Sequence, residues 1–138
     1  MDIARYLRVP FSFCLLVFSL SACKDSTTDN TQQNIVFPPS HVSYGKQVEP
    51  LFLAACAIPG CHTEESAPDA GGLSLETYQD ALSVPLVIIP KDTLDSRLVW
   101  SIQGEHGATI MPPIGRPPLS ANQITGLKTW IKEGALNN

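Results

Sequence analysis

Residues 56–62 read Cys-Ala-Ile-Pro-Gly-Cys-His, two cysteines followed directly by a histidine. Covalent haem attachment requires this order, because each thiol adds to a vinyl group of the porphyrin and the adjacent histidine then lies close to the iron. The usual form of the motif has two residues between the cysteines, and here there are four. The alternative is a short-loop disulfide in an exported protein, with His62 beside it by chance.

The N-terminal 22 residues predict an export signal. Arg5 and Arg8 give a positive start, and residues 9–22 carry no charge. That uncharged stretch is shorter than the ~20 residues needed to span a bilayer, so it favours a secretory signal over a transmembrane helix. It ends in Leu20-Ser21-Ala22-Cys23, which resembles the lipobox of a bacterial lipoprotein signal. The resemblance implies cleavage before Cys23 and lipidation of its thiol; an ordinary signal cleaved after an alanine is the alternative.

The cysteine count and the net charge restrict the roles that the cysteines can have and the partners that the protein can bind. The chain has 4 cysteines; Cys14 would leave with the signal and Cys23 would carry lipid, so Cys56 and Cys61 remain as a dedicated pair. The net charge is −4 and no basic tract is present. These features argue against a nucleic-acid partner.

Composition divides the chain into three parts. Residues 1–22 form the predicted signal peptide. Residues 23–40 hold the predicted lipidated cysteine and a flexible tether rich in Thr, Asp, Asn and Gln. Such a tether would reach roughly 20–25 Å on average and hold a domain off a membrane surface. Residues 41–138 form the predicted folded domain.

Apolar periodicity in the domain predicts four short helices. The first begins after Ser43 and leads to Cys56, either kinked at Pro50 or regular only from about Glu49. The second covers residues 75–82 after a Ser74 cap. The third begins at Asp92 or Thr93 and ends at Gly104. The fourth begins with a capping box of Ser120 and Gln123 and ends at Gly134.

Two segments between these helices have no helical pattern. Residues 84–90 are apolar and bounded by prolines, which predicts extended, buried chain. Residues 104–118 form a loop with four prolines and Met111 in its middle. A domain with so little regular structure usually needs a disulfide, a metal or a cofactor to complete its core. A haem would supply a large apolar core, whereas a disulfide across seven residues constrains little chain.

Taken together, residues 41–138 resemble a single-haem c-type cytochrome domain, closest to the planctomycete-type domains of many bacterial lipoproteins. The resemblance lies in these segments: Val42-Ser43-Tyr44, Val48-Glu49-Pro50-Leu51-Phe52, Gly60-Cys61-His62, Gly71-Gly72-Leu73-Ser74-Leu75 with Tyr78, Ile89-Pro90, Ser96-Arg97-Leu98, Met111-Pro112-Pro113, Leu119-Ser120, Ile124, Trp130-Ile131 and Gly134-Ala135. The four-residue spacer departs from the usual motif, and Pro59-Gly60 is a suitable turn for it.

By this resemblance, the fold is all-α and holds one covalent haem c. Cys56 and Cys61 would be the thioether sites, His62 the proximal iron ligand and Met111 the distal ligand. The implied function is single-electron transfer between redox proteins of the bacterial cell envelope, not enzymatic catalysis. Lipid on Cys23 would hold the protein on a membrane, facing the periplasm.

Several alternatives stay open at this point. His106 lies near Met111 in the sequence and is a competing ligand, although its Gly-Glu-His-Gly setting favours an exposed loop. Arg97 and Arg116 are candidate partners of the haem propionates. The chain could also be a haem-free, disulfide-bonded interaction module of the envelope. A third alternative is a haem-bearing sensor or an accessory subunit of a larger oxidoreductase.

Overall fold

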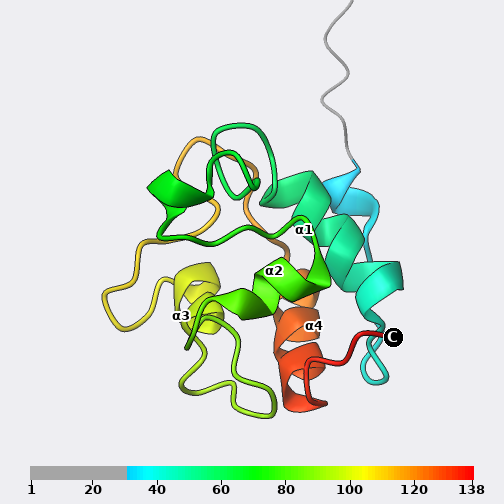
Figure 1. The fold of residues 1–138 in the computed structure, drawn as a ribbon. Helices are drawn as coiled ribbons and strands as arrows, with labels where there is room; N and C mark the ends of the chain where they lie inside the picture. The colour runs from blue at the N-terminus through cyan, green and yellow to red at the C-terminus, as the bar shows by residue number, and fades with distance from the viewer. Residues whose placement is uncertain (1–30) are drawn as a thin grey trace, which may run out of the picture.

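The computed structural model describes residues 31–138 (Figure 1). The predicted signal peptide, Cys23 and the start of the tether lie outside the described residues. No helix between residues 31 and 138 combines the length and the apolar character needed to cross a bilayer.

The described part of the chain is a small all-α domain without a β-strand. Three irregular helical turns accompany four α-helices (Figure 1). In chain order the elements are η1 (Gln32–Asn34), η2 (Tyr44–Val48), α1 (Glu49–Ala55), η3 (Ala67–Ala70), α2 (Tyr78–Ser83), α3 (Arg97–Gln103) and α4 (Ala121–Lys132). The expectation of an all-α fold is therefore confirmed.

A wide turn leads into α1 and accommodates Pro50. The backbone N–H of Val48 donates to the carbonyl of Ser43, five residues back, so η2 is a π-turn. The regular helix then begins at Glu49 with Pro50 in its first turn, where the missing N–H costs no intrahelical bond. Of the two expected arrangements, the later helix start is the one observed. The Ser43 hydroxyl caps the turn, as expected, by accepting from the N–H of Lys46.

The longest helix, α4, forms one side of the core. Its capping box is present as predicted: Ser120 accepts from the N–H of Gln123, and the Gln123 side chain accepts from the N–H of Ser120. Trp130 is fully buried and packs edge-on to Phe52 of α1, with ring centroids 6.3 Å apart. Gly134 follows the helix with a φ of 112°, as the predicted stop requires.

A segment before the predicted domain boundary packs against α4. The side chain of Asn122 pairs with the backbone of Phe37, accepting at 2.8 Å and donating at 3.0 Å. The buried amide of Gln123 donates to the carbonyls of Gln32 and Ile35. Among the described residues, the packed part therefore includes the segment before His41, because the backbone groups of Gln32, Ile35 and Phe37 find their hydrogen-bond partners on α4.

Gly126 makes this contact possible, since a Cβ at that position would overlap the Phe37 ring. We expect Gly126→Ala to lower the free energy of unfolding by about 1–3 kcal/mol, despite alanine's better helix propensity. Gly45→Ala is the matched control, because its Cβ would meet only the Asn138 carbonyl oxygen, at an ordinary 3.7 Å. Urea unfolding measures both variants. A Gly126→Ala protein as stable as the wild type would contradict the packing described here.

The second and third helices begin later than predicted. Ser74 is buried and accepts from the N–H of Glu76, so it shapes a turn, and Thr77 caps α2 instead. Asp92 similarly accepts from the N–H groups of Leu94 and Asp95 in a turn of its own. Helix α3 consequently starts at Arg97. It ends at Gly104 as expected.

Residues 84–90 are not extended as predicted. Val87 donates its N–H to the carbonyl of Val84, and Leu86 has a φ of 67°, so the chain turns here. Val87 and Ile88 are nevertheless buried, as the apolar pattern indicated, while Leu86 is exposed. The burial follows the apolar pattern, and the prolines and turns prevent a strand.

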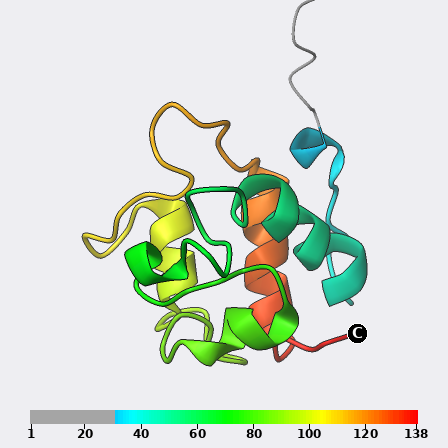
Figure 2. The ribbon, with the colours of Figure 1, turned by 45° about the horizontal axis from the view of Figure 1, so that its top comes forward.

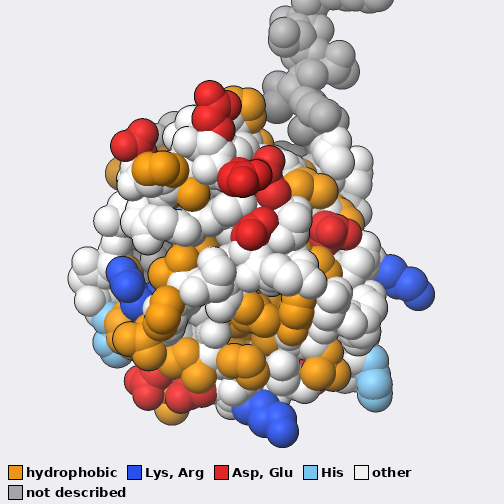
Figure 3. All heavy atoms as spheres, in the orientation of Figure 1, with side chains coloured by type: hydrophobic (Ala, Val, Ile, Leu, Met, Phe, Trp, Pro, Cys, Tyr) orange, Lys and Arg blue, Asp and Glu red, His pale blue; other side chains and the backbone are white. Residues whose placement is uncertain are grey.

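Helices α3 and α4 lie in contact, and residues 104–120 connect them by a long loop on the side away from the C-terminus (Figures 1 and 2). Residues 57–77 form a second long loop that faces it (Figure 2). Acidic side chains gather in the upper part of the face drawn in Figure 3, where this second loop lies. Its exposed acids are Glu64, Glu65 and Asp69. One loop carries Cys61 and His62, the other carries His106 and Met111, and Cys56 lies between α1 and the first of them.

Candidate haem site

The C-terminal end of α1 places Cys56. The N–H of Cys56 donates to the carbonyl of Phe52, at 2.9 Å, and the following loop turns back at once. The N–H of Cys61 donates to the carbonyl of Ile58, with Pro59 and Gly60 in the middle of the turn. Gly60 has a φ of 79°, which a type II turn requires at that position. The Pro59-Gly60 turn is thus present as predicted and accommodates the longer spacer.

Backbone and side-chain hydrogen bonds fix His62. Its N–H donates to the Cys56 carbonyl at 3.1 Å, and its own carbonyl accepts from the N–H of Leu75 at 2.8 Å. The ring Nδ1 lies 3.2 Å from the carbonyl oxygen of Leu73. A carbonyl only accepts, so Nδ1 is the donor of this hydrogen bond, and in the neutral ring the lone pair is then on Nε2. An imidazole held in this way is oriented to bind a metal through Nε2.

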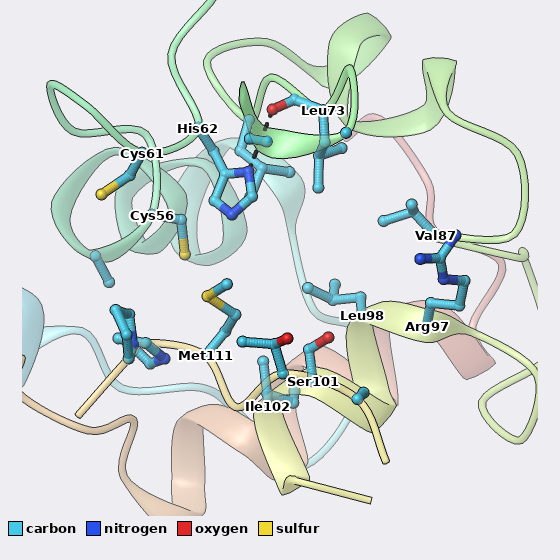
Figure 4. Close-up of a pocket in the computed structure, with 18 of the residues that line it drawn as sticks. Cys56, Cys61, His62, Leu73, Val87, Arg97, Leu98, Ser101, Ile102 and Met111 are labelled. Carbon is cyan, nitrogen blue, oxygen red and sulfur yellow. Dashed lines mark hydrogen bonds between the residues drawn. The ribbon is translucent and has the colours of Figure 1, made fainter. Parts of the chain in front are cut away.

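Met111 reaches the site from the loop that follows α3. Its N–H donates to the carbonyl of Ser101 at 2.9 Å, which fixes this part of the loop to the helix. The preceding Ile110 packs near Gly104, at the end of the same helix. The side chain of Met111 points toward His62 from the opposite side of a shared space (Figure 4).

That space is a cavity of about 550 Å³ lined by Cys56, Cys61, His62 and Met111 together. Its size lies within the range of roughly 300–1,000 Å³ that is usual for cofactor sites. Figure 4 shows His62 and Met111 on opposite walls, with the two cysteines at one end between them. The apolar part of the lining is formed by the buried side chains of Leu73, Leu75, Val87, Leu98, Ile102 and Leu119.

The two cysteines are free thiols in different surroundings. Burial raises the pKa of the Cys56 thiol to about 12, and the neighbouring Cys61 thiol adds to the rise. Cys56 is therefore a neutral thiol at physiological pH. Its sulfur faces the interior of the cavity, whereas the sulfur of Cys61 lies toward the edge (Figure 4).

His106, the alternative to Met111 as a distal ligand, does not lie at the cavity. The His106 ring is exposed and stacks on Trp100, with ring centroids 4.8 Å apart. It is not among the residues that line the cavity, whereas Arg97 and Arg116 are. The tertiary structure therefore brings together all four sequence-predicted site residues in the domain and leaves His106 outside.

Sequence reasoning missed the carbonyl of Leu73, which orients His62. Every residue has a backbone carbonyl, so the sequence does not show which one will orient a histidine. The only indication is the pair Gly71 and Gly72 just before Leu73, because both adopt positive φ and turn the chain back toward His62. Ser101, which also lines the cavity, has no such signal.

The donor set and the shape of the cavity fit a covalently attached haem. Two thiols lie at one end for two vinyl groups, and an imidazole nitrogen and a thioether sulfur face each other across the space. A nitrogen and a sulfur in these positions are a known axial pair for haem iron. The apolar walls suit the faces of a porphyrin.

Among known proteins, the family described as Planctomycete cytochrome C matches residues 59–115. That range includes Cys61, His62 and Met111 and begins three residues after Cys56. No curated protein and no solved structure matches the chain. The family match over residues 59–115 and the all-α fold together support a cytochrome c-like domain of the planctomycete type.

Proposed function

We propose that this protein is a membrane-tethered c-type cytochrome that carries single electrons through one covalently bound haem. Cys56 and Cys61 would form the thioether bonds, and His62 and Met111 would be the axial ligands. The family match by itself indicates a haem-binding electron carrier. The ligand pair, the number of haems and the tether are the finer parts of the proposal.

One observation supports the ligand pair above all others. His62 and Met111 face each other across a single cavity whose end is formed by the two cysteines (Figure 4). When bound there, the haem supplies a redox-active iron. His62 would offer Nε2 while Leu73 holds its Nδ1 proton, and Met111 would fill the remaining axial position. With both positions filled by side chains, electron transfer is favoured over the binding of an external substrate.

The membrane tether is supported by the sequence of the N-terminal region, which ends its apolar stretch in Leu20-Ser21-Ala22-Cys23. Lipid on Cys23 would keep the domain near redox proteins of the cell envelope at high effective concentration. In this proposal the residues between Cys23 and Gln32 would be the linker, since Gln32 and Phe37 already pack on α4. Periplasmic redox proteins are the partners that we propose.

The mass of the mature protein tests these parts together. We expect a chain that begins at Cys23 and carries acyl groups and one haem, purified from a bacterium able to assemble c-type cytochromes. A mass without haem, with two fewer hydrogens from a disulfide between Cys56 and Cys61, would favour the haem-free interaction module instead. Haem without stable Met111 coordination in the reduced state would favour a sensor.

A substitution tests the anchor separately. Cys23→Ser removes the thiol that would receive lipid, so we expect an uncleaved precursor without lipid. Fractionation and mass measurement of the product report this directly. Cys14→Ser is the control, because that cysteine lies within the predicted signal and should not change processing. A Cys23→Ser protein that remains membrane-bound at mature length would show that Cys23 is not the anchor.

A further inference from the structure

A cation lines the cavity at the end away from the cysteines. Figure 4 shows Cys56 and Cys61 on one side of the His62–Met111 pair and Arg97 on the other. Arg97 is part of the cavity lining and remains accessible to solvent. The sequence left Arg97 and Arg116 as alternative propionate partners, and the site as described above gives neither of them a role.

The backbone around Arg97 is firmly held. Its N–H donates to the carbonyl of Leu86, and the N–H of Leu98 donates to the carbonyl of Val87, both at 2.9 Å. The preceding Ser96 is fully buried. These two hydrogen bonds and the burial of Ser96 fix the backbone at the start of α3. The Cα atom of Arg97 is therefore held in place beside the cavity.

The guanidinium of Arg97 has no protein partner that accounts for it. Within residues 31–138 it forms no ion pair and no side-chain hydrogen bond. Its position in the first turn of α3 does not explain it either, because the helix dipole disfavours a cation there. An arginine that borders an apolar cavity without a carboxylate is suited to an anion of the bound molecule.

We propose that Arg97 binds a propionate carboxylate of the haem, an inference that rests on the proposed function. The two vinyl groups and the two propionates of haem lie on opposite edges of the porphyrin. Thioether bonds to Cys56 and Cys61 therefore direct the propionate edge toward the opposite end of the cavity, where Arg97 lies. Guanidinium and carboxylate pair through two parallel hydrogen bonds.

This pairing has an electrostatic consequence for the iron. A propionate carries negative charge near the metal and so stabilises the oxidised state. Arg97 offsets that charge and should raise the reduction potential. Arg97→Gln removes the positive charge while keeping hydrogen-bonding groups, so the potential should fall.

The test compares the haem-loaded wild type with Arg97→Gln and Arg97→Lys by electrochemistry and resonance Raman spectroscopy. We expect Arg97→Gln to lower the reduction potential and to shift the propionate bending mode. Arg97→Lys should restore most of the potential but not the bending mode, because lysine keeps the charge and loses the paired hydrogen bonds. Lys46→Gln is the charge-matched control, since Lys46 is exposed and is not part of the cavity lining.

Some results of this test would contradict the role of Arg97 alone, and one would also contradict the proposed function. Haem-loaded Arg97→Gln with an unchanged potential and bending mode would overturn the inference, as would Arg116→Gln reproducing both effects. If Arg97→Gln does not fold, the bending mode of Arg97→Lys decides, and an unshifted mode overturns the assignment. A wild-type protein without covalent haem would overturn the proposed function as well, whereas the other results leave that function intact.

Discussion

Replacing both Cys56 and Cys61 with alanine should abolish covalent haem attachment and leave the domain without a cooperative fold. The reason is the cavity of about 550 Å³ that lies among the helices. A bound porphyrin would cover the apolar side chains that line this space, and leaving them in contact with water costs ~25 cal/mol per Å² of apolar surface. A small domain has only ~5–15 kcal/mol of stability in total.

Haem staining after denaturing electrophoresis and urea unfolding would measure the two effects. The single variants Cys56→Ala and Cys61→Ala are the controls, since each should keep one thioether bond and much of the fold. A double variant that stays compact and unfolds in one sharp transition would show that haem does not organise this domain.

Replacing Met111 with alanine should remove the weak far-red absorption band of a methionine-ligated ferric haem. It should also lower the reduction potential, on the order of 0.1–0.3 V within the ~0.8 V range that axial ligands control. The thioether sulfur stabilises reduced iron, so its loss favours the oxidised state. Absorption spectra of the oxidised protein and electrochemistry check the two effects.

His106→Ala is the matched control for this experiment. The two residues lie in the same loop, but His106 is exposed and stacks on Trp100, whereas Met111 lines the cavity. We expect no change in the spectrum or the potential. If His106→Ala removes a ligand and Met111→Ala does not, the axial pair is bis-histidine and the partners are low-potential proteins.

The parts of the fold that sequence reasoning placed well are those governed by local interactions. The capping box of Ser120 and Gln123 satisfies its own hydrogen bonds within one turn. Gly104 ends α3 with a φ of 68°, and Pro59-Gly60 forms the predicted turn. Each of these features depends on residues close together in the chain, so the sequence pattern suffices.

The errors came where a distant contact overrode the local pattern. Ser74 looked like a helix cap but is buried, so Thr77 caps α2 instead. The polar residues before His41 looked like a free tether, but Gln32 and Phe37 find hydrogen-bond partners on α4. Local composition carries no information about partners that lie more than 80 residues away.

The side chains chemically suited to a haem can be identified from the amino-acid sequence: two cysteines followed by a histidine, and a methionine in a proline-rich loop. The packing of the chain was needed to show that Met111, and not His106, faces His62, and that Arg97 lies at the opposite end from the cysteines. The identity of a donor atom is a property of one residue. Its position across a cavity depends on how α1, α3 and their loops pack together.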